Sequence, residues 1–156
     1  MKTQILLGLI FVVLTGCKKE ESYSFVYPTT MSISKITVSR YALEKEDGTD
    51  WDLNDEPDLY ILLDKEWHSD FSLALISEVH SDSTLSYKYA FDVDWTIDSL
   101  TQSYVIGLFD EDEPDEDDYL GGFRFRPTDH YRGKKEINIS DPNLALNFQL
   151  LVEWNF

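Results

Sequence analysis

The sequence predicts an all-β protein, an eight-stranded antiparallel β-sandwich, and two patterns support that fold class. Apolar side chains recur at every second position from residue 31 onward, which is the repeat of a strand with one buried face. Segments rich in Asp, Asn, Pro and Gly separate these short apolar runs, and such residues favour turns. No stretch of the sequence carries the repeat of a long amphipathic helix.

The strands can be located one by one from this alternation. The clearest is the last, where seven apolar residues alternate with mostly polar neighbours over residues 144–156. Residues 91–97 alternate in the same way, and the Trp and Phe side chains of such strands are expected to form the core. Further strands are expected around Ile36 and Val38, over residues 59–63, 71–76, 87–91, 104–109 and 121–125, and briefly at Ile137 and Ile139.

Length and charge limit the classes of function. The chain of 156 residues suits one domain with a real core, and an aromatic content of 14% argues against a disordered acidic chain. A net charge of -17 excludes nucleic acid as a partner, because binding to phosphates requires Lys and Arg. The same charge disfavours unaided docking on anionic lipid.

The first residues are predicted to be a targeting segment rather than part of the fold. Lys2 precedes an apolar stretch at residues 5–14, which is too short to span a bilayer as a helix. The stretch ends Leu14-Thr15-Gly16-Cys17, which resembles the lipobox of bacterial lipoproteins and implies a diacylglyceryl group on the Cys17 thiol. Cys17 is the only cysteine, so no internal disulfide can form. An ordinary secretory signal is the alternative.

The lipobox resemblance divides the chain into three parts. Residues 1–16 are expected to be the signal peptide, 17–30 the lipidated cysteine and a flexible tether, and 31–156 the β-sandwich domain. Residues 18–22, Lys-Lys-Glu-Glu-Ser, resemble the export signal of surface lipoproteins in some Gram-negative bacteria. We therefore expect an outer-membrane lipoprotein, surface-exposed or otherwise periplasm-facing, attached to the membrane through the lipid on Cys17.

Two acidic segments are predicted to be loops that carry the function. Residues 110–118 are dense in Asp and Glu around Pro114, a composition that suits neither a strand nor a stable helix. Gly121 and Gly122 follow, and we expect them to permit the sharp return into the next strand. Residues 50–58 form the second cluster. Carboxylates about 5 Å apart repel by roughly 3 kcal/mol per pair at a dielectric near 20, so converging loops favour a hard cation such as calcium. Two solvated acidic loops are the alternative.

The spacing of these aspartates resembles C2 domains of the calcium-binding type. Asp52, five residues and then Asp58 before Leu-Tyr look like their first calcium loop. Asp110, Asp112, five residues and then Asp118 before Tyr-Leu-Gly look like their third. Trp95 in Asp-Trp-Thr-Ile resembles the Asn-Pro-x-Trp element of that family. An EF-hand does not fit, because positions five, six and twelve counted from Asp110 are Pro, Asp and Gly.

The C2 resemblance covers residues 31–156 and implies both a strand order and a metal site. A strand before the first loop and a long strand at the end suggest the phospholipase-type order. Other acidic residues of the loops, including Asp117, could replace a ligand, and the acidic tip of the third loop is poorly suited to entering an anionic leaflet. The implied calcium ligands are the carboxylates of Asp52, Asp58, Asp110, Asp112 and Asp118 and the backbone carbonyls of Trp51 and Glu111.

No catalytic residue is expected. The three histidines, His68, His80 and His130, are scattered without metal-ligand spacing, and the sequence contains no Gly-x-Ser-x-Gly element. The leading hypothesis is a lipoprotein whose C2-like domain binds calcium and interacts with an unidentified protein or glycan. The alternatives are a carbohydrate- or peptide-binding accessory lipoprotein in which calcium is structural or absent, and an envelope lipoprotein with no dedicated ligand.

Overall fold

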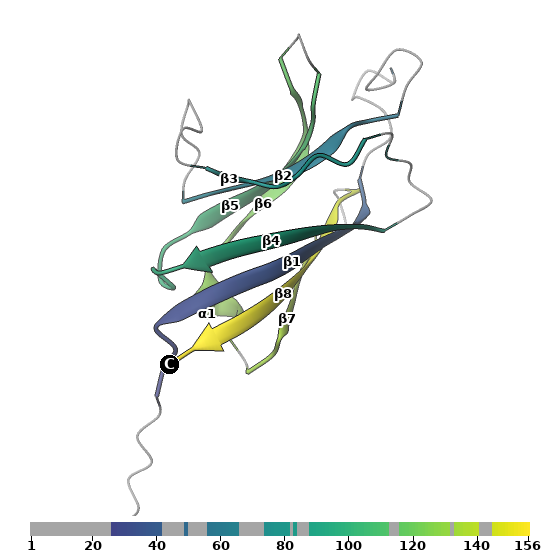
Figure 1. Ribbon diagram of the computed structural model, residues 1–156. Helices are drawn as coiled ribbons and strands as arrows, with labels where there is room; N and C mark the ends of the chain where they lie inside the picture. Colours follow the sequence, from purple (N-terminus) through teal and green to yellow (C-terminus); the bar gives the residue numbers. More distant parts are fainter. Residues whose placement is uncertain are drawn as a thin grey trace, which may run out of the picture.

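Two four-stranded antiparallel sheets form a sandwich in this computed structural model, which describes residues 26–41, 49, 56–65, 74–81, 83, 88–112, 116–131, 133–140 and 145–156 (Figure 1). The prediction of an all-β sandwich is therefore confirmed. In strand order, one sheet holds β4 (Tyr89–Ile97), β1 (Thr30–Arg40), β8 (Asn147–Asn155) and β7 (Glu136–Ser140), and the other holds β3 (Leu75–Ile76), β2 (Leu59–Asp64), β5 (Tyr104–Asp110) and β6 (Asp118–Phe125).

The first and last strands of the sandwich lie side by side. Met31 of β1 faces Trp154 of β8 on one side and Ile97 of β4 on the other. A strand therefore precedes the first acidic loop and a long strand closes the chain, which is the arrangement that we expected. The helix α1 (Pro127–His130) is a single turn that follows β6. No helix in the described part of the chain is long and apolar enough to cross a membrane.

The core is formed by the alternating apolar residues of the sequence, and in β1 the alternation changes once from odd-numbered to even-numbered buried positions. In β1, Met31 and Ile33 are buried, and a bulge before Lys35 moves the buried positions to Ile36 and Val38. The bulge leaves Lys35 outside, where its ammonium lies 3.1 Å from the carboxylate of an exposed aspartate. All residues of β2 and β5 are buried, because both faces of these apolar strands are covered.

Three details of the strand assignment differ from the sequence prediction. Residues 89–91 of one expected strand and residues 91–97 of the next belong to a single strand, β4, rather than two. Of the strand expected over 71–76, the described part contains only the two exposed residues of β3. The strand expected over 121–125 begins earlier, at Asp118, so Gly121 and Gly122 lie inside β6 and do not form the return from the acidic loop. Gly121 takes a φ of 140° beside a bulge opposite Leu108 and Phe109.

The sandwich has two distinct ends, which we call the acidic end and the entry end. The acidic end is where β2 and β6 begin and β5 terminates, and it carries Asp58, Asp110 and Asp118. The entry end is where the chain enters β1 at Thr30, beside Asn155 of β8. The β5 strand runs from the entry end to the acidic end, so the two are separated by about 20 Å, at about 3.3 Å for each residue of the strand (Figure 1).

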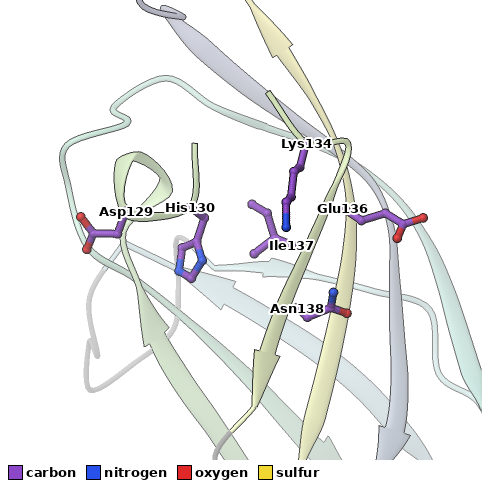
Figure 2. Close-up of a pocket in the computed structure, with 6 residues that line it drawn as sticks. All are labelled: Asp129, His130, Lys134, Glu136, Ile137 and Asn138. Carbon is purple, nitrogen blue, oxygen red and sulfur yellow. The ribbon is translucent and has the colours of Figure 1, made fainter. Parts of the chain in front are cut away.

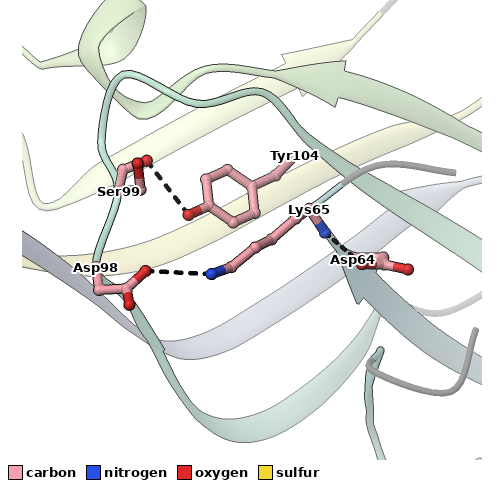
Figure 3. Close-up of polar contacts among 5 residues, drawn as sticks. All are labelled: Asp64, Lys65, Asp98, Ser99 and Tyr104. Atoms are coloured by element: carbon pink, nitrogen blue, oxygen red, sulfur yellow. Dashed lines mark hydrogen bonds and ion pairs between the residues drawn. The ribbon is translucent and has the colours of Figure 1, made fainter. Parts of the chain in front are cut away.

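Polar contacts fix the connections at the entry end (Figure 3). The ammonium of Lys65, just after β2, lies 3.5 Å from the carboxylate of Asp98, just after β4. The hydroxyl of Tyr104 donates a hydrogen bond to the carbonyl of Ser99 at 3.2 Å. The backbone N–H of Thr128 donates to the carbonyl of Leu100 at 3.1 Å, which holds α1 against the β4–β5 connection.

Candidate functional site: the acidic end

Three aspartates lie at the ends of three neighbouring strands, β2, β5 and β6, at the acidic end. Asp110 closes β5 and is paired in register with Leu59 of β2 on one side and with Asp118 of β6 on the other. Asp58 immediately precedes Leu59 and lies one residue beyond this row, where its backbone bonds to Glu111 and to the carboxylate of Asp110. Because paired residues of antiparallel strands have Cα atoms only about 4.5–5.5 Å apart, the two acidic segments of the sequence are brought together by the fold.

Backbone hydrogen bonds join the start of β2 to the end of β5. Asp110 is fully buried, and its Oδ1 accepts a hydrogen bond of 2.7 Å from the backbone N–H of Asp58. The backbone N–H of Glu111 in turn donates to the carbonyl of Asp58 at 2.9 Å. Asp110 therefore holds the end of the first acidic loop against the start of the third, and its carboxylate has a fixed orientation.

A tyrosine and a further aspartate hold the far side of the third loop. The hydroxyl of Tyr60 donates a hydrogen bond of 2.6 Å to Oδ2 of Asp117. Oδ1 of Asp117 accepts a longer hydrogen bond, 3.4 Å, from the backbone N–H of Asp112. The Tyr60 ring stacks on Phe109 at a centroid distance of 5.4 Å, and Phe109 contacts Tyr119 at 5.2 Å. These aromatic contacts hold the Tyr60 ring in position, with its hydroxyl against the carboxylate of Asp117.

The electrostatic environment of the acidic end is negative. Burial raises the pKa of Tyr60, and the hydrogen bond to Asp117 and the charges of Asp117 and Glu111 raise it further. Burial also raises the pKa of Tyr41, with additional contributions from Tyr89 and from the carboxylates of Glu56 and Asp110. Burial is the main cause of both shifts, and the contributions of Asp117, Glu111, Glu56 and Asp110 add a negative potential at this end, which attracts a cation.

Alkaline solution is expected to unfold the domain. Burial raises the pKa values of four tyrosines above the usual value near 10, namely those of Tyr41, Tyr60, Tyr104 and Tyr119. Because the unfolded chain releases these protons near pH 10 and the folded chain retains them, their contribution to stability is complete below about pH 10 and is lost as the pH rises further. Tyrosinate absorbance and far-ultraviolet circular dichroism, followed on the same samples, should change together. Ionisation of all nine tyrosines near pH 10 in a chain that stays folded would contradict the assignment.

The structure brings together five of the residues predicted to ligate calcium. Asp58, Asp110, Glu111, Asp112 and Asp118 all lie at the acidic end. The other predicted site residues, Trp51 and Asp52, and the lipidation residue Cys17 lie outside the described residues.

The acidic end offers oxygen donors, although its geometry is not that of a closed metal site. Within the described ranges, no group of three or more His, Cys, Asp or Glu side chains is arranged to hold a metal ion. The carboxylates of Asp110 and Asp117 bind backbone and tyrosine donors instead. Carboxylate and carbonyl oxygens are nevertheless the donors that calcium prefers, so the residue types fit this cation.

The sequence pattern does not indicate Tyr60 as a site residue, and it indicates its partner Asp117 only as a substitute ligand. The signal for Tyr60 was its position two residues after Asp58, in a strand whose aromatic and aliphatic residues were all expected to be core. Its contact with Asp117 spans 57 positions in the chain. The structure shows both residues as positioning groups for the third loop.

A second polar region lies around α1 and β7 (Figure 2). A pocket of ≈ 200 Å³ there is lined by charged groups of both signs, including Asp129, His130, Lys134 and Glu136. Figure 2 shows Asp129 and His130 on α1, Lys134 on the chain leading into β7, and Glu136 at the start of β7. Because the charges are mixed and partly exposed to solvent, we assign no ligand to this pocket.

Comparison with known proteins identifies the fold. No protein-family model matches the chain, and no curated protein sequence matches it. Human GIVD cytosolic phospholipase A2, in complex with methyl gamma-linolenyl fluorophosphonate and terbium chloride, matches with a TM-score of 0.55 and 14% identity over 83% of this chain. The two calcium-bound C2 domains of Extended-Synaptotagmin 2 match with a TM-score of 0.55 and 18% identity over 83% of this chain. A structure described as a C2 domain matches with a TM-score of 0.53 and 12% identity over 81%.

The matches differ in how much of each solved chain they cover. The chain spans 18% of the phospholipase chain, whose catalytic part lies outside the matched region, and 47% of the synaptotagmin chain. It spans 98% of the single C2 domain. At these identities the likeness is one of fold, and the described residues form a C2-like β-sandwich.

Proposed function

We propose that this chain is a membrane-anchored lipoprotein whose C2-like domain binds calcium at the acidic end and acts as an interaction module. The observation that supports the calcium site is the position of Asp58, Asp110 and Asp118 at the adjoining ends of three neighbouring strands, with the Asp58 backbone bonded to the Asp110 carboxylate. In this proposal the domain has no catalytic role. The lipid on Cys17 holds it at the outer membrane, facing the surface or otherwise the periplasm.

Calcium is the cation that the donor set favours. The proposed ligands are all oxygens, and calcium accepts six to eight oxygen ligands in flexible geometry. A divalent ion offsets the repulsion between aspartates on adjacent strands, which is roughly 3 kcal/mol for a pair about 5 Å apart. The solved Extended-Synaptotagmin 2 domains of the same fold are calcium-bound. The proposed ligand set is Asp52, Asp58, Asp110, Asp112 and Asp118 with the carbonyls of Trp51 and Glu111.

The role of the ion follows from the location that we propose. Extracellular modules typically bind calcium with dissociation constants of about 10⁻⁴ to 10⁻³ M, so the site would be occupied continuously outside a cell. A continuously bound ion fastens the acidic loops in one arrangement and presents them to a partner. We propose a protein or a glycan as that partner.

Calcium is expected to stabilise the domain against heat. At a calcium concentration ten times the dissociation constant, binding to the folded state adds about 1.4 kcal/mol to the free energy of unfolding. The melting temperature should therefore rise on addition of calcium and fall on addition of chelator. The Asp58→Asn, Asp118→Asn double variant should lose this response, because two carboxylates of the proposed site become neutral. Thermal melts followed by circular dichroism measure the shift, and terbium luminescence sensitised by nearby tyrosines measures occupancy.

A charge-matched control separates ligand loss from loss of negative charge. Asp94 and Glu153 are exposed carboxylates on the β4-β1-β8-β7 sheet, away from the acidic end. The Asp94→Asn, Glu153→Gln variant removes the same formal charge and should keep the full calcium response. Equal responses in the two double variants would refute the metal site, as would a wild-type melting temperature indifferent to calcium.

A further inference from the structure

The entry end carries an exposed aromatic cluster that the calcium site does not use. We define the entry-end aromatic cluster as Tyr27, Tyr131, Trp154 and Phe156. The Tyr131 ring contacts Trp154 edge-on at 5.0 Å and Phe156 at 6.4 Å. Tyr27 and Phe156 remain 70% and 68% exposed. The Trp154 indole N–H donates a hydrogen bond of 2.8 Å to the carbonyl of Lys134, so the cluster is held in place on the protein side.

A cavity of ≈ 320 Å³ lies within this cluster. Tyr27, Leu100, Thr128, Tyr131 and Trp154 line it, and its surface is mostly apolar. Within the described part of the chain, none of the side chains lining the cavity is charged. The lining combines this apolar surface with the hydroxyl groups of Tyr27, Thr101, Thr128 and Tyr131. Such a mixture of aromatic rings and uncharged polar groups suits a lipid–water interface.

The cluster lies where the proposed anchor joins the domain. Tyr27 follows Cys17 by ten residues, a distance of at most about 33 Å for an extended chain. The acidic end lies at the opposite end of β5 from the cluster (Figure 1). A lipid on Cys17 would thus bring the membrane close to the aromatic residues, whereas the acidic end is one strand length further away.

We propose that the entry-end aromatic cluster rests in the lipid–water interface of the anchoring membrane, with the acidic end directed away from it. Trp and Tyr side chains favour this interface, because an apolar ring and a polar group can each meet the appropriate environment. Attachment through a short tether keeps the local concentration of the cluster at the membrane high, so a weak contact suffices. The inference rests on the proposed anchor at Cys17 and is independent of calcium.

Charge disfavours the opposite orientation, with the acidic end at the membrane, more strongly than it favours the proposed one. Lys134 and Lys135 are exposed beside the cluster and can meet anionic headgroups, although Asp129 and Glu136 lie close to them and reduce the net charge. The aromatic contact therefore contributes more than the lysines. The acidic end, in contrast, is repelled by an anionic leaflet.

The orientation can be measured with a matched pair of fluorescent labels. Asp129 at the entry end and Glu116 at the acidic end are both exposed carboxylates, so Asp129→Cys and Glu116→Cys change the charge equally. When the lipid occupies the Cys17 thiol, the introduced cysteine is the only free thiol. The full lipidated chain is placed in vesicles of phosphatidylethanolamine and phosphatidylglycerol containing a headgroup-region spin-labelled lipid. We expect several-fold stronger quenching at residue 129 than at residue 116, with or without chelator.

Substitutions within the cluster test its contribution. Tyr27→Ser with Phe156→Ser removes two exposed rings and should reduce the difference in quenching toward none. Leu75→Ser with Ile76→Ser is the matched control, because these side chains are 40% and 57% exposed on β3, outside the cluster. Equal quenching at residues 116 and 129 in the wild-type background, or stronger quenching at 116, would overturn the inference.

A second experiment tests the aromatic contact independently of lipidation at Cys17. Palmitate incorporation that persists in Cys17→Ser would refute lipidation of Cys17. In that event the orientation is still measured on a chain in which a polyhistidine tag replaces residues 1–17 and binds nickel-chelating lipid in the same vesicles. With this tag, stronger quenching at residue 129 supports the aromatic contact, and equal quenching contradicts it, whatever the outcome of palmitate labelling.

Discussion

Replacing Phe148 with alanine is expected to lower the free energy of unfolding by about 3–5 kcal/mol. Phe148 is fully buried in β8 and faces Val38 of β1 and Ile139 of β7. Its ring contacts Phe123 of the opposite sheet edge-on at 5.9 Å. Truncation therefore leaves a cavity between the two sheets, which strands on both sides cannot close. Denaturant unfolding followed by far-ultraviolet circular dichroism measures the loss.

The control for this substitution lies in the same predicted strand. The apolar alternation includes Phe156 as well as Phe148, but β8 ends at Asn155 and Phe156 is 68% exposed. Phe156→Ala should change stability by less than about 0.5 kcal/mol, as surface substitutions usually do. A comparable loss of unfolding free energy in both variants would contradict the assignment of Phe148 to the core and of Phe156 to the surface.

Replacing Gly122 with alanine is expected to cost about 1–3 kcal/mol and to weaken the calcium response. A Cβ atom at this position would lie 2.4 Å from the carbonyl oxygen of Ile106 and 3.0 Å from the Cα of Gly107. Both contacts are with backbone, so β6 must move away from β5 to relieve them. Because β6 begins at Asp118, the displacement also moves a proposed calcium ligand. Denaturant unfolding and calcium-dependent melting measure the two effects.

An exposed position on the same strand provides the comparison for Gly122. Arg124→Ala removes a long side chain from β6 without adding an atom near β5, and it should leave both stability and calcium response close to wild type. If Gly122→Ala were as stable as Arg124→Ala, the close approach of the two backbones would not constrain the third loop.

The fold was predictable from the sequence because its strands bury one face in a regular way. The alternation in β8 and β4 survives tertiary packing, and the apolar runs of β2 and β5 match strands covered on both faces. The bulge in β1 was not predictable, because a shift of one position in a short strand leaves only two buried residues on either side of it. The start of β6 at Asp118, ahead of the expected strand at 121–125, was not predictable either, because a glycine required by a bulge and one required by a turn look alike in sequence.

The candidate site was predictable only in part. The spacing of the aspartates indicated correctly that the segments near Asp58 and Asp110 would meet, although coordination of an ion by them stays a prediction. The hydrogen bond from Tyr60 to Asp117 joins distant positions and belongs to no periodic pattern, so local sequence could not reveal it. Asp110 was expected only as a ligand, and the structure adds a second role, because its carboxylate also binds the backbone of Asp58.

The central position of β1 has a mechanical consequence. β1 has a hydrogen-bonded neighbour on each side, β4 and β8, and the chain enters it from the end opposite the acidic loops. A partner pulling on those loops, against an anchor at the start of β1, would stretch β1 along its own axis. Hydrogen bonds between strands run perpendicular to that axis, so the load would fall on both ladders at once in shear. Such a domain is expected to resist tension along this axis better than tension that opens one strand at a time.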